Sequence, residues 1–187
     1  MAINIYPTLE TERMQLRKPV AKDIPHIVNY AGNPKIEEMT LNIPHPYHEK
    51  DAISWINLAY EGFEDNSRYN FVMDLKPNKG IIGCIGLEIN TRFNRAELGY
   101  WVAEPYWNQG YASEATKAIL RFGFEKVGLH KIYASHYSKN PASGKVMIKN
   151  GMKKEGKLKE HVLKANQYLS VIQYRLTRDE YQRLKNK

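Results

Sequence analysis

The chain has 187 residues, 42% of them hydrophobic, and a formal net charge of +8 at pH 7. A domain of this size buries a sizeable core without needing disulfide bonds or structural metal ions. The single cysteine, Cys84, excludes an internal disulfide and a cysteine-rich metal site. The opening residues lack an apolar leader segment, and a run of about 18 apolar residues occurs nowhere, so we expect one soluble, cytoplasmic domain spanning residues 1–187.

Helix and strand patterns alternate along the chain without an internal repeat. Asp23 is expected to cap the first helix and Gly32-Asn33-Pro34 to end it, while Pro141 opens a later helix that Asn150-Gly151 closes. In chain order, the first half is predicted to hold a strand over 14–18, a helix over 23–31, a loop over 41–48, a helix over 49–62, and antiparallel strands over 69–75, 81–90 and 95–102. The second half is predicted to hold a helix over 111–127, a strand over 131–138, a helix over 142–149 and a short segment over 152–155. A loop or strand over 161–163, a strand over 167–176 and a terminal helix from Thr177 complete the chain.

Alternation with a period of two predicts the direction of the side chains in two of these strands. In the strand over 81–90, the odd positions form an apolar face that we expect to pack on the core, so Glu88 points the other way. The residues on the apolar face are Ile81, Gly83, Ile85, Leu87 and Ile89, and those on the face of Glu88 are Ile82, Cys84 and Gly86. In the next strand, Glu97 shares its face with Gly99 and Trp101.

The segment from Ala96 to Ala115 places a glycine where a loop enters a helix. A strand is followed there by the loop Asn108-Gln109-Gly110 and by a helix that opens at Tyr111 or Ala112. Free backbone N–H groups at such a junction converge on a negative ligand, and the helix dipole adds to the attraction. The segment has neither the Lys-Ser/Thr ending of a P-loop nor the triple glycine of a dinucleotide fingerprint, which argues against ordinary ATP and NAD sites. The sequence therefore predicts a phosphate cradle of another kind.

Four separated segments resemble the GNAT superfamily of N-acetyltransferases, and in particular its branch that acetylates ribosomal-protein N-termini. Its acetyl-CoA motif, Arg/Gln-x-x-Gly-x-Gly/Ala, matches Trp107, Gly110 and Ala112, with Trp107 departing from the usual residue. The other three matches are residues 9–17, the Asn-x-x-Ser segment 140–143, and residues 149–156. The resemblance implies an α/β (α+β) fold, in which a mixed, mostly antiparallel sheet carries helices on both faces and the strands over 95–102 and 131–138 splay apart for CoA.

The resemblance also implies which residues contact acetyl-CoA, the one cofactor that we expect. The pantetheine arm is expected to pair with the strand over 95–102, where the Val102 amide is a candidate oxyanion donor. Ser143 is expected near the CoA sulfur as a thiolate proton donor or hydrogen-bond partner, and Asn140 near the arm; both residues also suit a helix N-terminus. The expected cofactor-binding residues are Tyr100, Trp101, Val102, Trp107, Asn108, Gln109, Gly110, Tyr111, Ala112, Ser113, Asn140, Ser143 and Lys149.

Acyl transfer from a thioester to an amine requires that the amine lose a proton, that the oxyanion be stabilised, and that the thiolate gain a proton. A carboxylate acting through a water can serve as the base. Glu88 is our first candidate and Glu97 our second, and for each the alternative is an ordinary surface glutamate. Two histidines in the loop over 42–48 lack a nearby carboxylate pair, so we expect no metal site. Ser170 stands where many relatives carry aspartate near the acceptor, which points to an altered acceptor preference.

Positive charge is concentrated in the last third of the chain. Residues 131–187 hold 14 Lys and Arg against 4 Asp and Glu, whereas residues 1–130 hold 14 against 16. An asymmetry of this kind often marks a face that meets a polyanion. CoA, ribosomal RNA near a protein substrate, and a solubilising surface without a partner all stay open. The spacing of Lys145, Lys149 and Lys153 or Lys154 suits the adenosine phosphate of CoA.

We therefore expect direct acetyl transfer from acetyl-CoA to an amine in a ternary complex, without a covalent enzyme intermediate. As the resemblance implies, the preferred acceptor is the N-terminal α-amine of a protein, such as a ribosomal protein. With a pKa of ~8, an α-amine is also easier to deprotonate than a lysine at ~10.4. The alternatives are a small-molecule amine (a polyamine, an amino sugar or an antibiotic) and a non-catalytic acyl-CoA-binding regulatory module. Association with the ribosome and the choice between monomer and homodimer stay open, and no membrane partner is expected.

Overall fold

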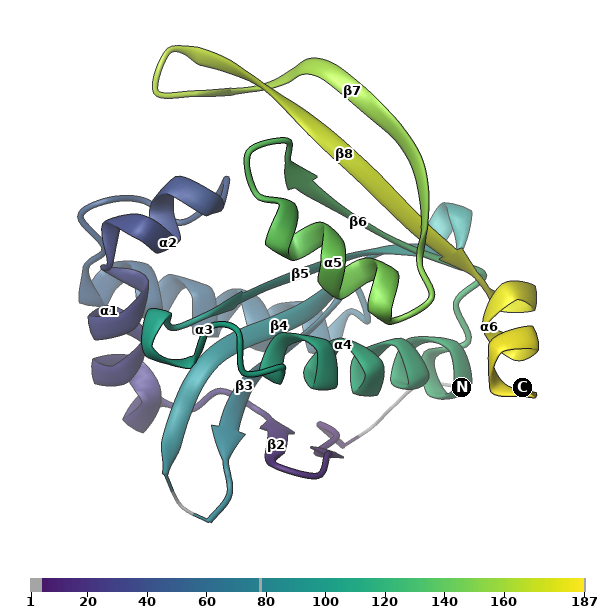
Figure 1. Cartoon of the computed structure of the whole chain (residues 1–187). Coiled ribbons are helices and arrows are strands. Elements are labelled where there is room, and N and C mark those ends of the chain that lie inside the picture. The colour runs from purple at the N-terminus through teal and green to yellow at the C-terminus, as the bar shows by residue number, and fades with distance from the viewer. Residues whose placement is uncertain (1–4, 78, 187) are drawn as a thin grey trace.

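Eight strands form one mixed sheet in the order β1-β2-β3-β4-β5-β6-β8-β7 (Figure 1). The structure is a computed structural model that describes residues 5–77 and 79–186, so Asn78, between the strands predicted over 69–75 and 81–90, lies outside the described residues. The strands are β1 Leu9–Glu10, β2 Met14–Arg17, β3 Arg68–Leu75, β4 Gly80–Asn90, β5 Arg95–Val102, β6 Lys131–Tyr137, β7 Lys153–Lys164 and β8 Gln167–Thr177. The α-helices are α1 Ile24–Ala31, α2 Pro34–Met39, α3 Glu49–Glu64, α4 Tyr111–Phe122, α5 Pro141–Lys149 and α6 Arg178–Lys185.

The strands β5 and β6 are parallel and part soon after they start. Their ladder holds only Arg95 opposite Lys131, Ala96 opposite Ile132 and Glu97 opposite Tyr133. The other neighbouring strands pair antiparallel. Beyond Glu97, β5 therefore turns away from β6, and Figure 1 shows the two strands diverging. The predicted mixed sheet with a splayed pair of strands is confirmed.

Helices cover both faces of the sheet, with α4 and α5 on one side and α3 on the other (Figure 1). On the first side, Phe122 of α4 packs edge-on against Tyr69 and Phe71 of β3, at ring separations of 5.1 and 5.8 Å. On the second side, Ile27 of α1 and Ile56 of α3 are buried in a separate cluster on the sheet. Burial on both faces explains why residues 81–87 are almost uniformly apolar, as expected for a central strand. Cys84 is a buried free thiol, and burial raises its pKa.

A β-bulge in β4 makes part of the predicted alternation wrong. Met73 pairs with Gly83 and Asp74 with Ile81, so Ile82 has no partner of its own on β3. Before the bulge the faces are exchanged: Ile82 joins the cluster beneath α4, and Ile81 joins the cluster beneath α1 and α3. After the bulge the expected pattern holds, because Leu87 faces α4 and Glu88 points the other way, as Cys84 does.

Two elements differ from the predicted boundaries for local reasons. Asn33-Pro34 ends one helix but also begins α2, because the Asn33 side chain accepts from the Lys35 N–H and Pro34 fits the first helical position. The segments predicted over 152–155 and 161–163 belong to one strand, β7, which two register shifts interrupt. β7 lies at the edge of the sheet, where its lysines oppose further strand pairing.

Two helix termini also differ from expectation. Asp23 does not cap α1 with its side chain; a short 3-10 turn precedes the helix, and the carboxylate accepts from the Val20 N–H and from both terminal nitrogens of Arg17. The predicted helix over 111–127 consists of α4 and a five-residue π turn that ends at Gly128, where φ is +85°. Within residues 5–77 and 79–186, no helix is both long and apolar enough to cross a membrane.

Candidate functional site

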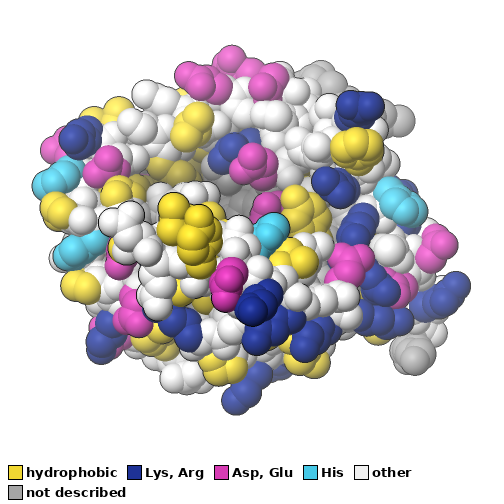
Figure 2. Space-filling model, turned by 90° about the horizontal axis from the view of Figure 1, so that it is seen from above, with side chains coloured by type: hydrophobic (Ala, Val, Ile, Leu, Met, Phe, Trp, Pro, Cys, Tyr) yellow, Lys and Arg dark blue, Asp and Glu magenta, His cyan; other side chains and the backbone are white. Residues whose placement is uncertain are grey.

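Where β5 and β6 part, a cleft of about 1700 Å³ opens in the molecule. The loop after α2 and the helix α3 wall one side of it with apolar side chains, and α5, β6 and β8 wall the other. Figure 2 looks into this hollow and shows basic and acidic side chains within it. The apolar residues on the first wall include Leu41, Ile43, Trp55 and Leu58.

The loop before α4 has the geometry of an anion cradle. Gly110 adopts φ of +84°, which favours glycine, and lies directly before the first residue of α4. Because the first amides of a helix have no partner within it, the N–H groups that follow Gly110 are free to meet a phosphate. Trp107 fixes the loop: its indole N–H donates to the carbonyl of Val102 at 2.5 Å, which anchors the cradle to the end of β5.

Arg13, which the sequence did not single out as a site residue, holds this cradle from the other side. Its backbone N–H and its Nε donate to the carboxylate of Glu114 at 2.8 and 2.7 Å. A terminal nitrogen of Arg13 donates to the Gln109 carbonyl at 2.9 Å, and the guanidinium lies 4.3 Å from the ring centre of Tyr111. Arg13 therefore adds a positive charge beside the first turn of α4. Its position just before β2, about a hundred residues away in sequence, gave no local signal.

Tyr100 and Ser143 face each other across the cleft. The Tyr100 hydroxyl lies 2.7 Å from Ser143 Oγ, so that β5 and α5 meet at a hydrogen bond. Burial raises the pKa of Tyr100 to about 12, although the bond to Ser143 opposes the shift, so the phenol stays protonated near neutrality. Asn140 accepts from the Ser143 N–H at 3.3 Å and caps α5, as one of its two predicted roles required.

Four side chains form a polar row across the sheet. The backbone register places Arg68 opposite Glu88, Glu88 opposite Glu97, and Glu97 opposite Tyr133. Glu88 is tied to Arg68 by an ion pair of 3.0 Å. Among the described residues, Glu97 receives one long bond of 3.4 Å, from the Tyr133 hydroxyl. Glu97 is exposed to the cleft, yet the protein around it removes enough water, with a smaller contribution from the charge of Glu88, to raise its pKa against the effect of that bond. Glu97 is therefore the less compensated carboxylate.

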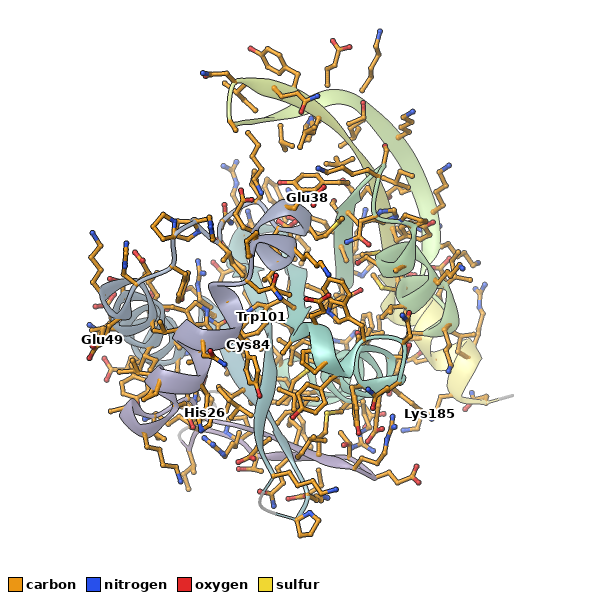
Figure 3. The ribbon with its side chains drawn as sticks, turned by 60° about the vertical axis from the view of Figure 1, so that its left-hand side comes forward. His26, Glu38, Glu49, Cys84, Trp101 and Lys185 are labelled. Carbon is orange, nitrogen blue, oxygen red and sulfur yellow. The ribbon has the colours of Figure 1, made fainter. Side chains whose placement is uncertain are left out.

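Beside this row, the floor of the cleft consists of glycine and aromatic residues. Gly99 and Trp101 follow Glu97 on the same face of β5, as predicted, and all three line the cleft. Trp101 lies opposite Cys84 of β4, and Figure 3 shows the two side chains at the centre of the sheet with Glu38 of α2 above them.

Two lysines tie the two walls together above the cleft. Lys164, at the end of β7, donates to the Thr40 carbonyl at 2.6 Å and to the Glu37 carbonyl, and pairs with the Glu37 carboxylate at 2.9 Å. Its side chain is only 14% exposed. Lys139, just before α5, pairs with Glu38 at 3.3 Å. These contacts, which we call the α2 bridge, join the β7–β8 hairpin and the start of α5 to α2.

Other basic residues that the sequence grouped together are separated in the structure. Lys145 and Lys149 of α5 both line the cleft. Lys153 instead pairs with Glu180 of α6 at 3.0 Å. Ser170 accepts from the Glu160 N–H at 3.0 Å, beside a register shift in β7, and is absent from the residues that line the cleft.

Nearly all predicted site residues lie in this one cleft. Gln109 does not contribute to its lining, because its side chain turns back to donate to the Pro105 carbonyl at 2.8 Å. The predicted residues that line the cleft are Glu88, Glu97, Tyr100, Trp101, Val102, Trp107, Asn108, Gly110, Tyr111, Ala112, Ser113, Asn140, Ser143 and Lys149.

Comparison with known proteins agrees with this geometry. The profile of the acetyltransferase (GNAT) domain family matches residues 13–153. An uncharacterised N-acetyltransferase of Bacillus subtilis, YnaD, is 31% identical over 175 residues, covering 92% of this chain and 98% of the relative. The spermidine N(1)-acetyltransferase of Escherichia coli is 26% identical over 139 residues, covering 68% and 74% of the two chains.

Among solved structures, the ribosomal-protein-S5-alanine acetyltransferase of Vibrio fischeri superposes with a TM-score of 0.83 over 94% of this chain and 98% of its own, at 22% identity. That likeness extends the agreement in fold to nearly the whole molecule. The chain therefore belongs to the GNAT acetyltransferase family and is an N-acetyltransferase that takes its acyl group from acyl-CoA and delivers it to an amine.

Proposed function

We propose that this enzyme transfers an acetyl group from acetyl-CoA to the α-amine at the N-terminus of a peptide or protein. The observation that carries the proposal is the composition of the cleft: a carboxylate with a raised pKa, Glu97, and a hydroxyl pair, Tyr100 and Ser143, line the same space beside the anion cradle. These are the groups needed to take a proton from an amine and to return one to a leaving thiolate.

In this proposal Glu97 is the general base, directly or through one water. Glu88 was the first candidate from the sequence, but its ion pair with Arg68 ties its carboxylate to β3. Within residues 5–77 and 79–186 no lysine or arginine forms an ion pair with Glu97, and the raised pKa of Glu97 brings it closer to that of an α-amine. As the amine nitrogen bonds to the thioester carbonyl carbon, the nitrogen gives its proton to Glu97 and the carbon–sulfur bond breaks.

Ser143 donates a proton to the leaving sulfur, and Tyr100 resupplies the serine through their 2.7 Å hydrogen bond. Tyr100 then regains a proton from water, and Glu97 releases to water the proton that it took from the amine. A phenol with a pKa of about 12 is a neutral donor at physiological pH. Directly after β5, the N–H of Ala103 donates to the Ile82 carbonyl of β4. Because successive amides of a strand point to opposite sides, the Val102 N–H points toward β6 and is available to an oxyanion.

The charges that line the cleft support a monovalent amine. The acidic residues of the lining are Asp51, Glu88 and Glu97, and the basic ones are Arg68, Arg95, Lys131, Lys139, Lys145 and Lys149. Lysines and arginines thus outnumber the carboxylates, which leaves no excess negative charge to receive a polyamine. The apolar wall around Trp55 and Leu58 instead suits the side chain of a first residue. A cytoplasmic location and an encounter with the ribosome would fit a protein acceptor.

The α2 bridge favours a second candidate, a small-molecule amine. Because Lys164 and Lys139 join the walls above the cleft, a bulky protein acceptor must either enter as an extended terminus or displace these contacts. The similarity to a spermidine acetyltransferase is a further reason to test small amines.

Thiol release from acetyl-CoA tests the proposal. The acceptors are short peptides with free N-termini, the same peptides with blocked N-termini, spermidine and an aminoglycoside, read against an acceptor-free control. We expect turnover with free peptides that Glu97→Gln lowers by about 100-fold or more and Glu88→Gln lowers much less. Turnover confined to spermidine or the aminoglycoside would replace the first candidate with the second.

A further inference from the structure

A second row of residues crosses the sheet next to the polar row and has no role in the chemistry described above. Asn70 of β3 lies opposite Gly86 of β4, and Gly86 lies opposite Gly99 of β5. All three line the cleft. One polar side chain therefore stands beside two positions without side chains, between the polar row and Trp101.

The two glycines serve different purposes. A Cβ atom at Gly86 would lie 2.1 Å from Asn70 Oδ1, so the amide of Asn70 occupies the space that a side chain would need. A Cβ atom at Gly99 would meet no atom within 4 Å. The floor of the cleft is thus hollow above Gly99, with the Asn70 amide, Glu97 and Trp101 around it.

The side-chain amide of Asn70, beside this hollow, has an N–H donor without a hydrogen-bond partner among the described residues. The residue is only 8% exposed, and its Nδ2 is buried without a partner among the described residues. Buried amide groups are nearly always hydrogen-bonded in folded proteins, so this donor requires an acceptor that the described residues do not supply. An amide presents an acceptor and a donor side by side. Such a pair is complementary to a ligand that carries an N–H group and an oxygen close together.

We propose that the hollow above Gly99 binds the amine end of the acceptor. In this proposal, Asn70 determines specificity by forming a hydrogen bond with an oxygen next to that amine. The acceptor class is then the α-amino carbonyl compounds, which include peptide N-termini and amino acid amides. Their amine donates to Oδ1, and their carbonyl oxygen accepts from Nδ2. Polyamines offer donors alone and leave Nδ2 unpaired. This inference rests on the proposed function and names its acceptor more closely.

Equilibrium binding tests the inference without requiring turnover. A short peptide with a free N-terminus is titrated by calorimetry into the protein saturated with CoA, and spermidine is titrated in the same way. We expect Asn70→Ala to weaken peptide binding by at least tenfold and to leave spermidine and CoA binding within twofold. Gly99→Ala should weaken peptide binding by at least tenfold, because its methyl group fills the hollow.

Matched controls separate a local effect from damage to the fold. Thr116→Val removes another buried, unpartnered polar atom from a residue that does not line the cleft, and Gly156→Ala adds a methyl group at another glycine with open space around it. Both should leave peptide binding unchanged. Equal weakening of peptide and spermidine by Asn70→Ala, or peptide affinity within twofold of wild type, would overturn the inference. Peptide binding with the expected Asn70 dependence but without acetyl transfer would instead count against the proposed function alone.

Discussion

Replacing Arg13 tests the proposal that the cradle before α4 holds phosphate groups of CoA. In the folded protein, burial acts to raise the pKa of Glu114, but its bonds from Arg13 and Thr11 outweigh that effect and keep the carboxylate ionised. Glu114 lies in the first turn of α4 and its side chain is 17% exposed. With Arg13→Ala, this negative charge stays beside the phosphate site without its partner.

The size of the effect follows from two terms. A charge repelling another at about 10 Å costs about 1–2 kcal/mol at an effective dielectric constant of about 20. Loss of the bond from Arg13 to the Gln109 carbonyl loosens the loop and adds up to about 1 kcal/mol. We therefore expect CoA binding to weaken by about 2 kcal/mol, or about 30-fold.

Calorimetry of CoA binding measures this change, and a second substitution identifies its cause. In Arg13→Ala combined with Glu114→Gln, the repelling charge is gone, so the affinity should return to within about fivefold of wild type. The matched control is Arg121→Ala, which removes an exposed arginine from the far end of the same helix. A loss below about threefold in Arg13→Ala, or no recovery in the double variant, would refute this account of the cradle.

Three further results are expected. Ser143→Ala and Tyr100→Phe should each lower kcat by about 100-fold and leave CoA affinity unchanged, because both groups act on the leaving sulfur in the proposed mechanism. Stopped-flow thiol release measures kcat and calorimetry measures CoA affinity. A loss of CoA affinity as large as the loss of kcat would contradict the assignment. Because desolvation in the cleft raises the pKa of Glu97, the acidic limb of the profile of kcat/KM against pH should lie above the usual pKa of a glutamate. This limb should disappear in Glu97→Gln and persist in Glu88→Gln; persistence in both variants would exclude Glu97 as the base. Although burial opposes the shift, bonds from Thr177 and Lys153 lower the pKa of Glu180 from its usual 4.5 to about 2, so its contribution to the stability of the fold is complete above about 4.5 and is lost as the pH falls toward 2. Urea titrations should show that Glu180→Gln loses less free energy of unfolding over that pH range than wild type does, and an equal loss would show that Glu180 has no such role.

Local sequence patterns were sufficient to place the loop before α4, because its turn and the start of the helix are made by adjacent residues. A glycine between a loop and a helix permits the positive φ that Gly110 adopts, and the same pattern identified the start of α4. Glu97, Gly99 and Trp101 were placed on one face by alternation alone, since no bulge interrupts the pairing of β5 with β4.

Contacts between distant residues were beyond the reach of such patterns. The pairing of Arg13 with Glu114 depends on how β2 lies against α4, and the ion pair of Arg68 with Glu88 depends on the register of β3 and β4. The bulge at Ile82 exchanged the faces of two isoleucines, because a bulge adds one residue to a strand without a distinctive composition. Sequence reasoning therefore found the candidate carboxylates but could not show which one forms an ion pair with an arginine.

The most direct test of the central claim is the position of the acetyl group on a peptide that offers two amines. A short peptide with a free N-terminus and one internal lysine is incubated with acetyl-CoA and the enzyme, and tandem mass spectrometry locates the product. Acetylation of the α-nitrogen, absent from the enzyme-free control and strongly reduced with Glu97→Gln, is the predicted result. Acetylation of the lysine ε-nitrogen, or of neither amine when spermidine is acetylated under the same conditions, would contradict the claim.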